Sequence, residues 1–591
     1  MEFEVFAEYL ADIEAKESRL YKTWHTSKLL KDISDDELHI VLLLLQSRIF
    51  PPYDERDVGL ASKSVAKALA KATGHPEDEV TEAWKKQGDL GIVAEQLTEN
   101  RHQQTLFNDS FTVKDVYETF VDIAESAGDG SEERKFDLYG KLITQLDGAA
   151  ARYATRLAIQ DLRVGIGEGT IRDAIAWAFL DEAKPNYDEG NQSIDPEDRE
   201  VYEAAIEAVQ SAVDKTNDFS YAANQAKKNL ANLQSVSITP GKPVKVMLAQ
   251  RSESLEDAFE TVGRPAAFEY KYDGMRMQIH YKDGDIHIFT RSLEDVTKQF
   301  PEVKSYLEEH ILDYAAFQER LDGDQPSFVL DAEAVSYNAD TNEYEPFQTI
   351  SKRIKRKYDI EKHRQEHPVE VNVFDILYLN GEELVDQPYR DRRETIDEII
   401  EAERYRLCLA DQITTNDVSD AEAFFQDALN RGDEGLMVKN IDGQYKPGSR
   451  VGYMLKYKST MDDLDLVIVG AEWGQGKRSG WLTSYLIACR DGDEYETIGR
   501  VATGLKEKPE EGLSFKEMTE LLQPHIVGED GREVAVSPKV VIKVRFEEIQ
   551  SSPDYESGYA LRFPRVVGLR SDRSPEDSTT KQEIKNMYEK Q

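Results

Sequence analysis

A lysine stands between acidic residues, shortly before a glycine, in the segment FEYKYDGMR at residues 268–276. On a β-strand alternate side chains share a face, so Glu269, Lys271 and Asp273 would point together. A lysine amine held in such a pocket, with a turn at Gly274 behind it, suits nucleophilic catalysis. A surface lysine beside a turn is the plainer alternative, and this segment by itself leaves both interpretations open.

Acidic and aromatic residues suited to nucleotide chemistry follow in later strand-like runs. Glu333 and Glu434 offer carboxylate oxygens, which Mg²⁺ prefers, and Mg²⁺ neutralises charge that develops on phosphate. Phe374 could stack on a purine, and Glu269 could accept a hydrogen bond from an adenine amino group. Structural or solvated carboxylates, and core packing of Phe374, are the alternatives.

Basic residues complete the candidate site. Lys456 and Lys458 alternate with Leu455 and Tyr457, so both lysines would project from one strand face. Near Lys271, and with a metal, they would lower the pKa of that amine by like-charge repulsion; an exposed lysine pair on an edge strand is the alternative. Three arginines suit bidentate contacts with phosphate or ribose, although each could be a surface ion pair: Arg276, Arg291 and Arg450.

These residues belong to motifs that follow one another along the chain. The motifs are KYDGMR (271–276), FTRS (289–292), DAE (331–333), VFD (373–375), EGLMVK (434–439), KPGSR (446–450) with LKYK (455–458), and RFPR (562–565) with RSDR (570–573). The set resembles the motifs of the covalent nucleotidyltransferases, which are the DNA ligases, RNA ligases and mRNA-capping enzymes. The likeness extends from Lys242 onward.

The segment DLRVG at 161–165 resembles part of the DNA-binding domain of archaeal and eukaryotic replicative ligases. The combined resemblance implies an ATP-dependent DNA ligase of that type, with ATP and Mg²⁺ as cofactors and nicked duplex DNA as substrate. In that family the lysine at the position of Lys271 attacks the α-phosphate of ATP and releases pyrophosphate. The AMP then moves to a 5′-phosphate at the nick, and the 3′-hydroxyl expels it. The resemblance also places Arg291 beside the ribose.

The sixth motif lies in the C-terminal part of the chain. Its resemblance implies that Arg562, Arg565 and Arg570, with Asp572, help to orient pyrophosphate in the first step and then swing away. The chain departs from the family at two positions, since many relatives carry arginine where this chain has Gly568 and lysine where it has Arg573. Both departures put individual phosphate contacts of the motif in question.

Three other interpretations compete with an ATP-dependent DNA ligase. An RNA ligase or capping guanylyltransferase would share the chemistry, but the long helical N-terminal part argues against it. A non-catalytic scaffold tethered to a sliding clamp is disfavoured by the intact lysine and acidic motifs. NAD-dependent ligases carry a four-cysteine zinc module, which Cys408 and Cys489 cannot build.

The glycines at 474–476 fail the spacing of a phosphate-binding P-loop, so we predict a hairpin loop there.

The pattern of apolar residues predicts a multidomain fold in three parts. Residues 1–235 look all-helical and form the expected DNA-binding domain. Residues 240–459 mix strand-like and helical runs, which indicates an α+β nucleotidyltransferase domain. Residues 460–591 contain short strands separated by turns, which suits a small β-barrel of the OB type followed by a C-terminal helix.

The net charge of −41, from 114 acidic and 73 basic residues, is unusual for a protein that binds DNA. Acidic surfaces of this kind occur in halophilic proteins, where salt screens self-repulsion, so we interpret the chain as halophilic; an acidic mesophilic protein is the alternative. The acidic N-terminus is unlike a signal peptide, and no apolar run could span a bilayer. We expect a soluble cytoplasmic monomer without a membrane partner.

A short segment at 103–107, QQTLF, resembles the clamp-binding peptide of archaeal ligases. Leu106 and Phe107 could fill an apolar pocket while Gln103 hydrogen-bonds beside it. We therefore predict a sliding clamp of the PCNA type as a partner. The alternative is that Leu106 and Phe107 pin a loop to the helical core.

Overall fold

The computed structural model describes residues 1–591 apart from 55, 100–110, 129, 322–324, 346, 355–357, 459–462, 493 and 590–591. The chain divides into two compact units. Unit 1 comprises Met1–Ala61, Phe107–Gln145 and Arg156–Lys458, and unit 2 comprises Ser62–Leu106, Leu146–Thr155 and Ser459–Gln591. None of the helices in the described residues combines the length and apolar character needed to cross a membrane.

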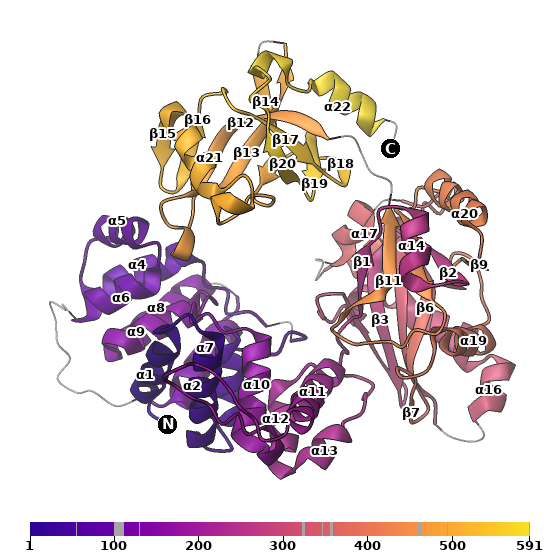
Figure 1. The fold of residues 1–591 in the computed structure, drawn as a ribbon, viewed down its shortest axis with the longest axis horizontal. Coiled ribbons are helices and arrows are strands. Elements are labelled where there is room, and N and C mark those ends of the chain that lie inside the picture. Colours follow the sequence, from indigo (N-terminus) through magenta and orange to yellow (C-terminus); the bar gives the residue numbers. More distant parts are fainter. Residues whose placement is uncertain are drawn as a thin grey trace. The chain divides into compact units, whose positions relative to one another are not determined.

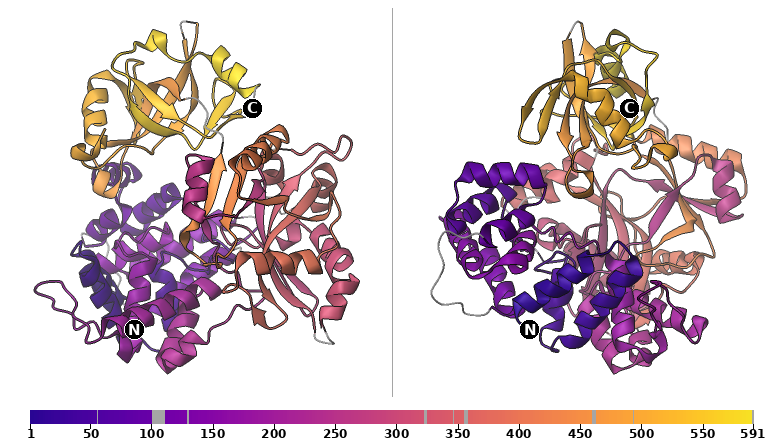
Figure 2. Two further views of the ribbon diagram at one scale, coloured as in Figure 1. Left: turned by 45° about the vertical axis from the view of Figure 1, so that its right-hand side comes forward. Right: turned by 60° about the vertical axis from the view of Figure 1, so that its left-hand side comes forward.

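The N-terminal part of the chain is helical, as predicted, and its helices are the indigo and purple segments in Figures 1 and 2. Asp198 illustrates how the sequence starts one of them, because its carboxylate accepts hydrogen bonds from the first free amides of α11. The helices assigned to unit 1 are α1 (Phe3–Glu14), α2 (Arg19–Asp32), α3 (Leu38–Leu45), α7 (Val113–Glu125), α8 (Ser131–Gln145), α10 (Glu168–Phe179), α11 (Arg199–Thr216), α12 (Phe219–Lys228) and α13 (Leu230–Gln234). Those of unit 2 are α4 (Ser62–Thr73), α5 (Glu77–Gln87), α6 (Leu90–Glu99) and most of α9 (Gly148–Ala158).

The central part of unit 1 contains two sheets. Sheet 1 has the strand order β1-β11-β10-β2-β9, with β1 (Leu248–Arg251), β11 (Arg450–Lys458), β10 (Gly435–Asn440), β2 (Ala266–Lys271) and β9 (Gln412–Thr415). Sheet 2 has the order β4-β3-β5-β6-β7, with β4 (Asp285–Phe289), β3 (Met275–Lys282), β5 (Ser327–Ser336), β6 (Val369–Leu379) and β7 (Glu382–Glu383); β8 (Leu407–Leu409) adds to β6. The predicted α+β character is confirmed.

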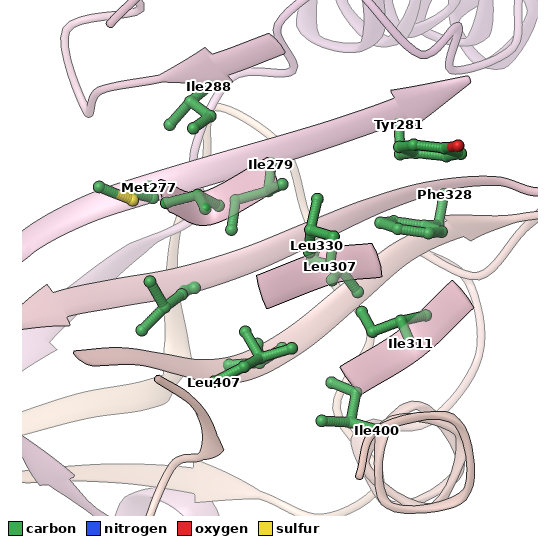
Figure 3. Close-up of a cluster of buried hydrophobic side chains, with 14 of the residues drawn as sticks. Met277, Ile279, Tyr281, Ile288, Leu307, Ile311, Phe328, Leu330, Ile400 and Leu407 are labelled. Carbon is green, nitrogen blue, oxygen red and sulfur yellow. The ribbon is translucent and has the colours of Figure 1, made fainter. Parts of the chain in front are cut away.

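Helices cover the outer face of each sheet. Helices α14 (Leu255–Val262) and α20 (Val418–Asn430) pack on the apolar side of sheet 1. Sheet 2 packs against α15 (Glu302–Leu307), α16 (Ala315–Leu321), α17 (Phe347–Ile354) and α19 (Tyr389–Ile399), and Figure 3 shows part of this core around Ile279 and Leu330. A third cluster, with Val329 and Leu377 from sheet 2 and Met454 from sheet 1, lies between the sheets.

Strict alternation along the strands directs the polar side chains to the space between the sheets. On β3, the side chains of Met275, Met277 and Ile279 enter the outer core. The residues between them, among which is Arg276, therefore point to the opposite face. On β2, Phe268 and Tyr270 enter the core under α14 and α20, so Lys271 likewise points away from it.

The C-terminal strands belong to unit 2 and form a strand-rich domain. They are β12 (Leu464–Trp473), β13 (Leu482–Asp491), β14 (Glu494–Val501), β15 (Ile526–Asp530), β16 (Glu533–Val536), β17 (Val541–Arg545), β18 (Glu548–Ser551), β19 (Tyr559–Arg562) and β20 (Arg565–Leu569). Strands β12 to β17 join with β20 in one sheet, while β18 and β19 pair as a separate hairpin. Among the described residues the strand pairing leaves β14 and β15 at edges, so the closed barrel that we predicted is not seen. Helix α21 (Phe515–Leu522) and the expected C-terminal helix, α22 (Lys581–Tyr588), pack on this domain.

Candidate functional site

Lys271 ends β2, and its neighbours across sheet 1 follow from the register of the strands. Gly435 on β10 lies opposite Lys271 on one side and opposite Lys458 of β11 on the other. A Cβ on Gly435 would lie 2.3 Å from the carbonyl oxygen of Tyr457, and its φ of +141° is a conformation that other residues rarely adopt. The glycine therefore allows β11 to pack closely against β10 and leaves no side chain between Lys271 and Lys458.

Glu434, directly before that glycine, joins the two lysines. Its Oε2 atom forms ion pairs with the Nζ atoms of Lys271 and of Lys458, the latter at 2.7 Å. Its backbone amide donates to the Lys271 carbonyl at 2.8 Å. Burial would raise the pKa of Glu434, but the two lysines outweigh it and lower the pKa to about 2. Glu434 is therefore ionised at neutral pH and fixed against the candidate nucleophile.

Glu333 reaches the same place from sheet 2. Burial raises its pKa to about 7, with Lys271 and Arg276 opposing the rise and Glu434 and Asp273 adding to it. The carboxyl thus lies within the electrostatic reach of four charged groups from the predicted motifs. Close packing depends on Gly274, where a Cβ would lie 2.5 Å from the Ala334 carbonyl oxygen and 2.9 Å from Glu333 Cγ.

The acidic groups fit a divalent cation. Glu333 and Glu434 come from different sheets and both influence the field at Lys271, and Asp273 adds a third carboxylate. The pKa of Glu333 stays raised despite Lys271 and Arg276, and a Mg²⁺ ion would add positive charge at this carboxyl. The donor set consists of hard oxygens, as Mg²⁺ prefers.

The residues expected around the adenine make more contacts with neighbouring side chains than the sequence predicted. The Glu269 side chain is buried and its carboxylate pairs with Lys439 Nζ at 2.6 Å and accepts a hydrogen bond from the Tyr389 hydroxyl. Phe374 is half-buried, with the Lys439 ammonium 5.0 Å and the Arg276 guanidinium 5.3 Å from its ring centroid. Sequence reasoning missed Tyr389, which lies in no motif, and gave no role to Lys439, which ends the EGLMVK motif.

The three candidate arginines are placed differently. Arg276 is held inside unit 1, where it pairs with the fully buried Asp331 at 2.5 Å and donates to the Tyr445 hydroxyl at 3.1 Å. Arg291 is exposed on the turn after β4, and Arg450 is exposed at the start of β11. Neither makes an ion pair with a residue that the structure describes. The structure therefore brings Arg276 to the site and leaves the other two free to meet a ligand. Lys456 on β11 lies opposite Met437 of β10, and the other neighbour of Met437 across the sheet is Glu269 on β2.

The residues of the sixth motif belong to unit 2. Arg570 pairs with Asp465 and with Asp572, both at 2.8 Å, and Arg562 pairs with Glu548 at 2.8 Å. A hydrogen bond from Arg570 lowers the pKa of Asp572 to about 2. Arg565 is exposed at the start of β20.

Two further predicted segments have separate outcomes. The glycine-rich residues 474–478 lie between the antiparallel strands β12 and β13, which confirms a hairpin loop rather than a P-loop. The predicted clamp peptide with Gln103, Leu106 and Phe107 lies outside the described residues.

Comparison with known proteins gives consistent results along the chain. Residues 246–458 match the family described as ATP dependent DNA ligase domain, residues 2–176 match DNA ligase N terminus, and residues 478–573 match ATP dependent DNA ligase C terminal region. The DNA ligase of Nanoarchaeum equitans is 43% identical, covering 100% of this chain and 99% of the relative. That of Thermococcus fumicolans is 39% identical, covering 100% and 98%. The solved structure Pmar-Lig_PreS3 shares the fold, with a TM-score of 0.57, 16% identity, and coverage of 95% of this chain and 99% of that one.

Proposed function

Because the chain belongs to the ATP-dependent DNA ligases, we propose that Lys271 is the residue on which it carries AMP. The enzyme uses ATP to seal nicks in duplex DNA. The observation that carries the assignment is the position of Lys271, which ends a strand and lies against Glu434 and within the field of Glu333. No other amine in the first motif could serve as the nucleophile.

In the first step, the Lys271 nitrogen forms a bond with the α-phosphorus of ATP as the bond to pyrophosphate breaks. An ammonium paired with Glu434 has no lone pair for this attack, so the pair must separate and Lys271 must lose a proton first. Lys458 contacts the same carboxylate oxygen, so it can hold Glu434 when Lys271 leaves. The AMP then passes to the 5′-phosphate of the nick, and the 3′-hydroxyl displaces it, so that each step is a phosphoryl transfer.

We propose Glu333 and Glu434 as the ligands of Mg²⁺. The ion, when bound, neutralises charge on the phosphate oxygens. Around the nucleotide, Phe374 offers a ring face for the adenine, while Glu269 would share its carboxylate between Lys439 and the adenine amino group. Phosphate and ribose contacts are proposed for Arg276, Arg291, Arg450 and Lys456, and pyrophosphate contacts for Arg562, Arg565 and Arg570 with Asp572.

The proposed partners and setting rest on the sequence. We propose that the enzyme is a cytoplasmic monomer with three domains (1–235, 240–459 and 460–591), and that the net charge of −41 adapts it to concentrated salt. A sliding clamp would bind Gln103, Leu106 and Phe107. In this proposal, replacing Leu106 and Phe107 with alanine removes clamp binding and spares lysine adenylation, whereas retained clamp binding in the folded double variant rejects the peptide.

The deciding experiment is incubation with ATP radiolabelled at the α-phosphate, followed by mapping of the labelled peptide. We expect label on Lys271, and none in Lys271→Ala. Lys282→Ala is the matched control, because Lys282 is an exposed lysine at the end of β3. Label retained on a folded Lys271→Ala variant would reject the assignment.

A further inference from the structure

A group of metal-ligating side chains lies apart from the nucleotide site. His363 and Glu366 are on α18 (Ile360–Glu366), and His367 follows directly. One candidate ligand atom from each of the three residues lies within 4.8 Å of the other two. The ligase reaction as derived above uses none of them.

The local sequence brings the histidines together. Residues four apart on a helix are neighbours on one face, so His363 and His367 lie one turn apart, with ring centroids 6.3 Å from each other and planes inclined by 19°. Glu366 adds its carboxylate from the same turn, with Oε2 3.9 Å from His363 Nδ1.

A second carboxylate approaches from another element. Glu345, in the segment after β5, has its Oε2 atom 3.9 Å from His367 Nδ1. Glu345 is held in place, since its backbone amide donates to the Ser336 carbonyl at 2.8 Å and its carboxylate accepts from the Ser336 hydroxyl at 2.9 Å. On the other side, the His367 carbonyl accepts a hydrogen bond from the buried Arg353 at 2.9 Å. The two halves of the group are therefore anchored independently.

The unsatisfied polar atoms of the group are ring nitrogens of its two histidines. The Nδ1 atoms of His363 and His367 are inaccessible to water and have no hydrogen-bond partner among the described residues. Buried polar atoms are nearly always hydrogen-bonded, so such a pair requires an explanation. Distances of 3.9 Å are too long for hydrogen bonds but close to the separation of two ligands of one tetrahedral Zn²⁺, about 3.4 Å for bonds of about 2.05 Å.

We propose that His363, Glu366 and His367, with Glu345 as a fourth ligand, bind a divalent transition-metal ion such as Zn²⁺. Two imidazoles and carboxylates suit Zn²⁺, whereas Mg²⁺ prefers sites made of oxygen alone. The site is therefore chemically distinct from the pair Glu333 and Glu434.

The bound ion would connect α18 to the segment after β5. That segment continues to Phe347, whose backbone amide donates to Asp273 Oδ2 at 3.0 Å. Asp273 belongs to the motif that contains Lys271. The ion thus fixes a part of the chain that contacts the nucleotide site. It is a structural ion and takes no part in the ligase reaction.

The test uses the full chain, stripped with a chelator and then titrated with Zn²⁺ by calorimetry in a large excess of Mg²⁺. We expect one tight Zn²⁺ per chain, a higher melting temperature with Zn²⁺, and a loss of affinity of more than about 100-fold in the double variant His363→Gln with His367→Gln. His39→Gln, which removes an exposed histidine on α3, is the control and should bind as the parent does.

Two further readouts keep the result decisive. Co²⁺ should give the visible absorption of a four-coordinate site in the parent, and the double variant should lose it. If the double variant does not fold, Glu366→Gln replaces it, because this side chain is exposed, and it should weaken Zn²⁺ binding by at least about 10-fold. Unchanged Zn²⁺ affinity in either folded variant would overturn the proposal.

Discussion

The two sheets of unit 1 present polar faces to the same site, but the surroundings lower the pKa of a carboxyl on sheet 1 and raise the pKa of a carboxyl on sheet 2. On sheet 1, lysines outnumber acids around Glu434, and the pKa of this carboxyl falls to about 2. On sheet 2, burial and neighbouring acids raise the pKa of Glu333 to about 7, and the nearby cation Arg276 is paired with Asp331. The two carboxyls of one site therefore differ, because Glu434 is ionised at neutral pH and Glu333 titrates near neutrality. The local field, more than the residue type, decides what each group can do.

The largest effect should come from removing the charge on sheet 1. Glu434→Gln leaves Lys271 and Lys458 without their shared partner and removes a proposed metal ligand. We expect lysine adenylation to slow about 1,000-fold, which corresponds to about 4 kcal/mol. Single-turnover transfer of radiolabelled AMP measures it, and Glu422→Gln, an exposed change on α20, should have no effect. Adenylation within a few-fold of the parent would remove Glu434 from the site.

On sheet 2, removing a buried charge should reduce the stability of the fold more than the activity. Asp331→Asn leaves the partly buried Arg276 guanidinium without its counter-ion, and breaking a buried pair in this way costs about 3 kcal/mol. Urea unfolding at constant KCl measures the loss. The matched control is Asp397→Asn, whose ion pair with Arg393 is half exposed and should contribute less than about 1 kcal/mol. Equal losses in the two variants would contradict the contrast between the sheets.

A smaller effect should appear in the pH dependence of stability. Between about pH 4.5 and 7 the folded chain keeps a proton on Glu333 that the unfolded chain has released, so the free energy of unfolding falls as pH rises through this window. Glu333→Gln cannot titrate, so its stability relative to the parent should improve by about 2 kcal/mol from pH 5 to pH 8. Parallel unfolding curves at the two pH values would show that Glu333 has an ordinary pKa. Mg²⁺, if Glu333 binds it, should reduce the difference.

The smallest expected effect distinguishes the electrostatic field at one buried group from the net charge of the whole chain. Raising KCl should stabilise the whole chain, since salt screens the repulsion from a net charge of −41. Buried groups are screened much less, so the difference between Glu333→Gln and the parent should change by less than about 0.5 kcal/mol. Thermal unfolding across a KCl series measures both quantities. Full stability of the parent in dilute buffer would contradict the halophilic interpretation.

Local patterns predicted much of this architecture, and long-range pairing accounts for the rest. The alternation in FEYKYDGMR was enough to place Lys271 and Glu269 on one face, because that relation depends on neighbours in sequence. The contact of Glu434 with Lys271 depends on the pairing of β10 with β2, whose residues are far apart along the chain. The same reason explains why Tyr389 was missed and why a closed barrel was expected from short strands whose pairing the sequence does not specify.

The bare backbone at Gly435 has a consequence for how the enzyme meets other chemicals in the cell. Because Gly435 places no side chain between the two lysines, Glu434 can pair with Lys271 and Lys458 at once. A protonated amine has no lone pair, so it does not attack aldehydes, activated acyl groups or carbon dioxide, with all of which free amines react. The ion pair would therefore protect the proposed nucleophile, Lys271, from acylation and carbamate formation until a substrate draws the carboxylate away.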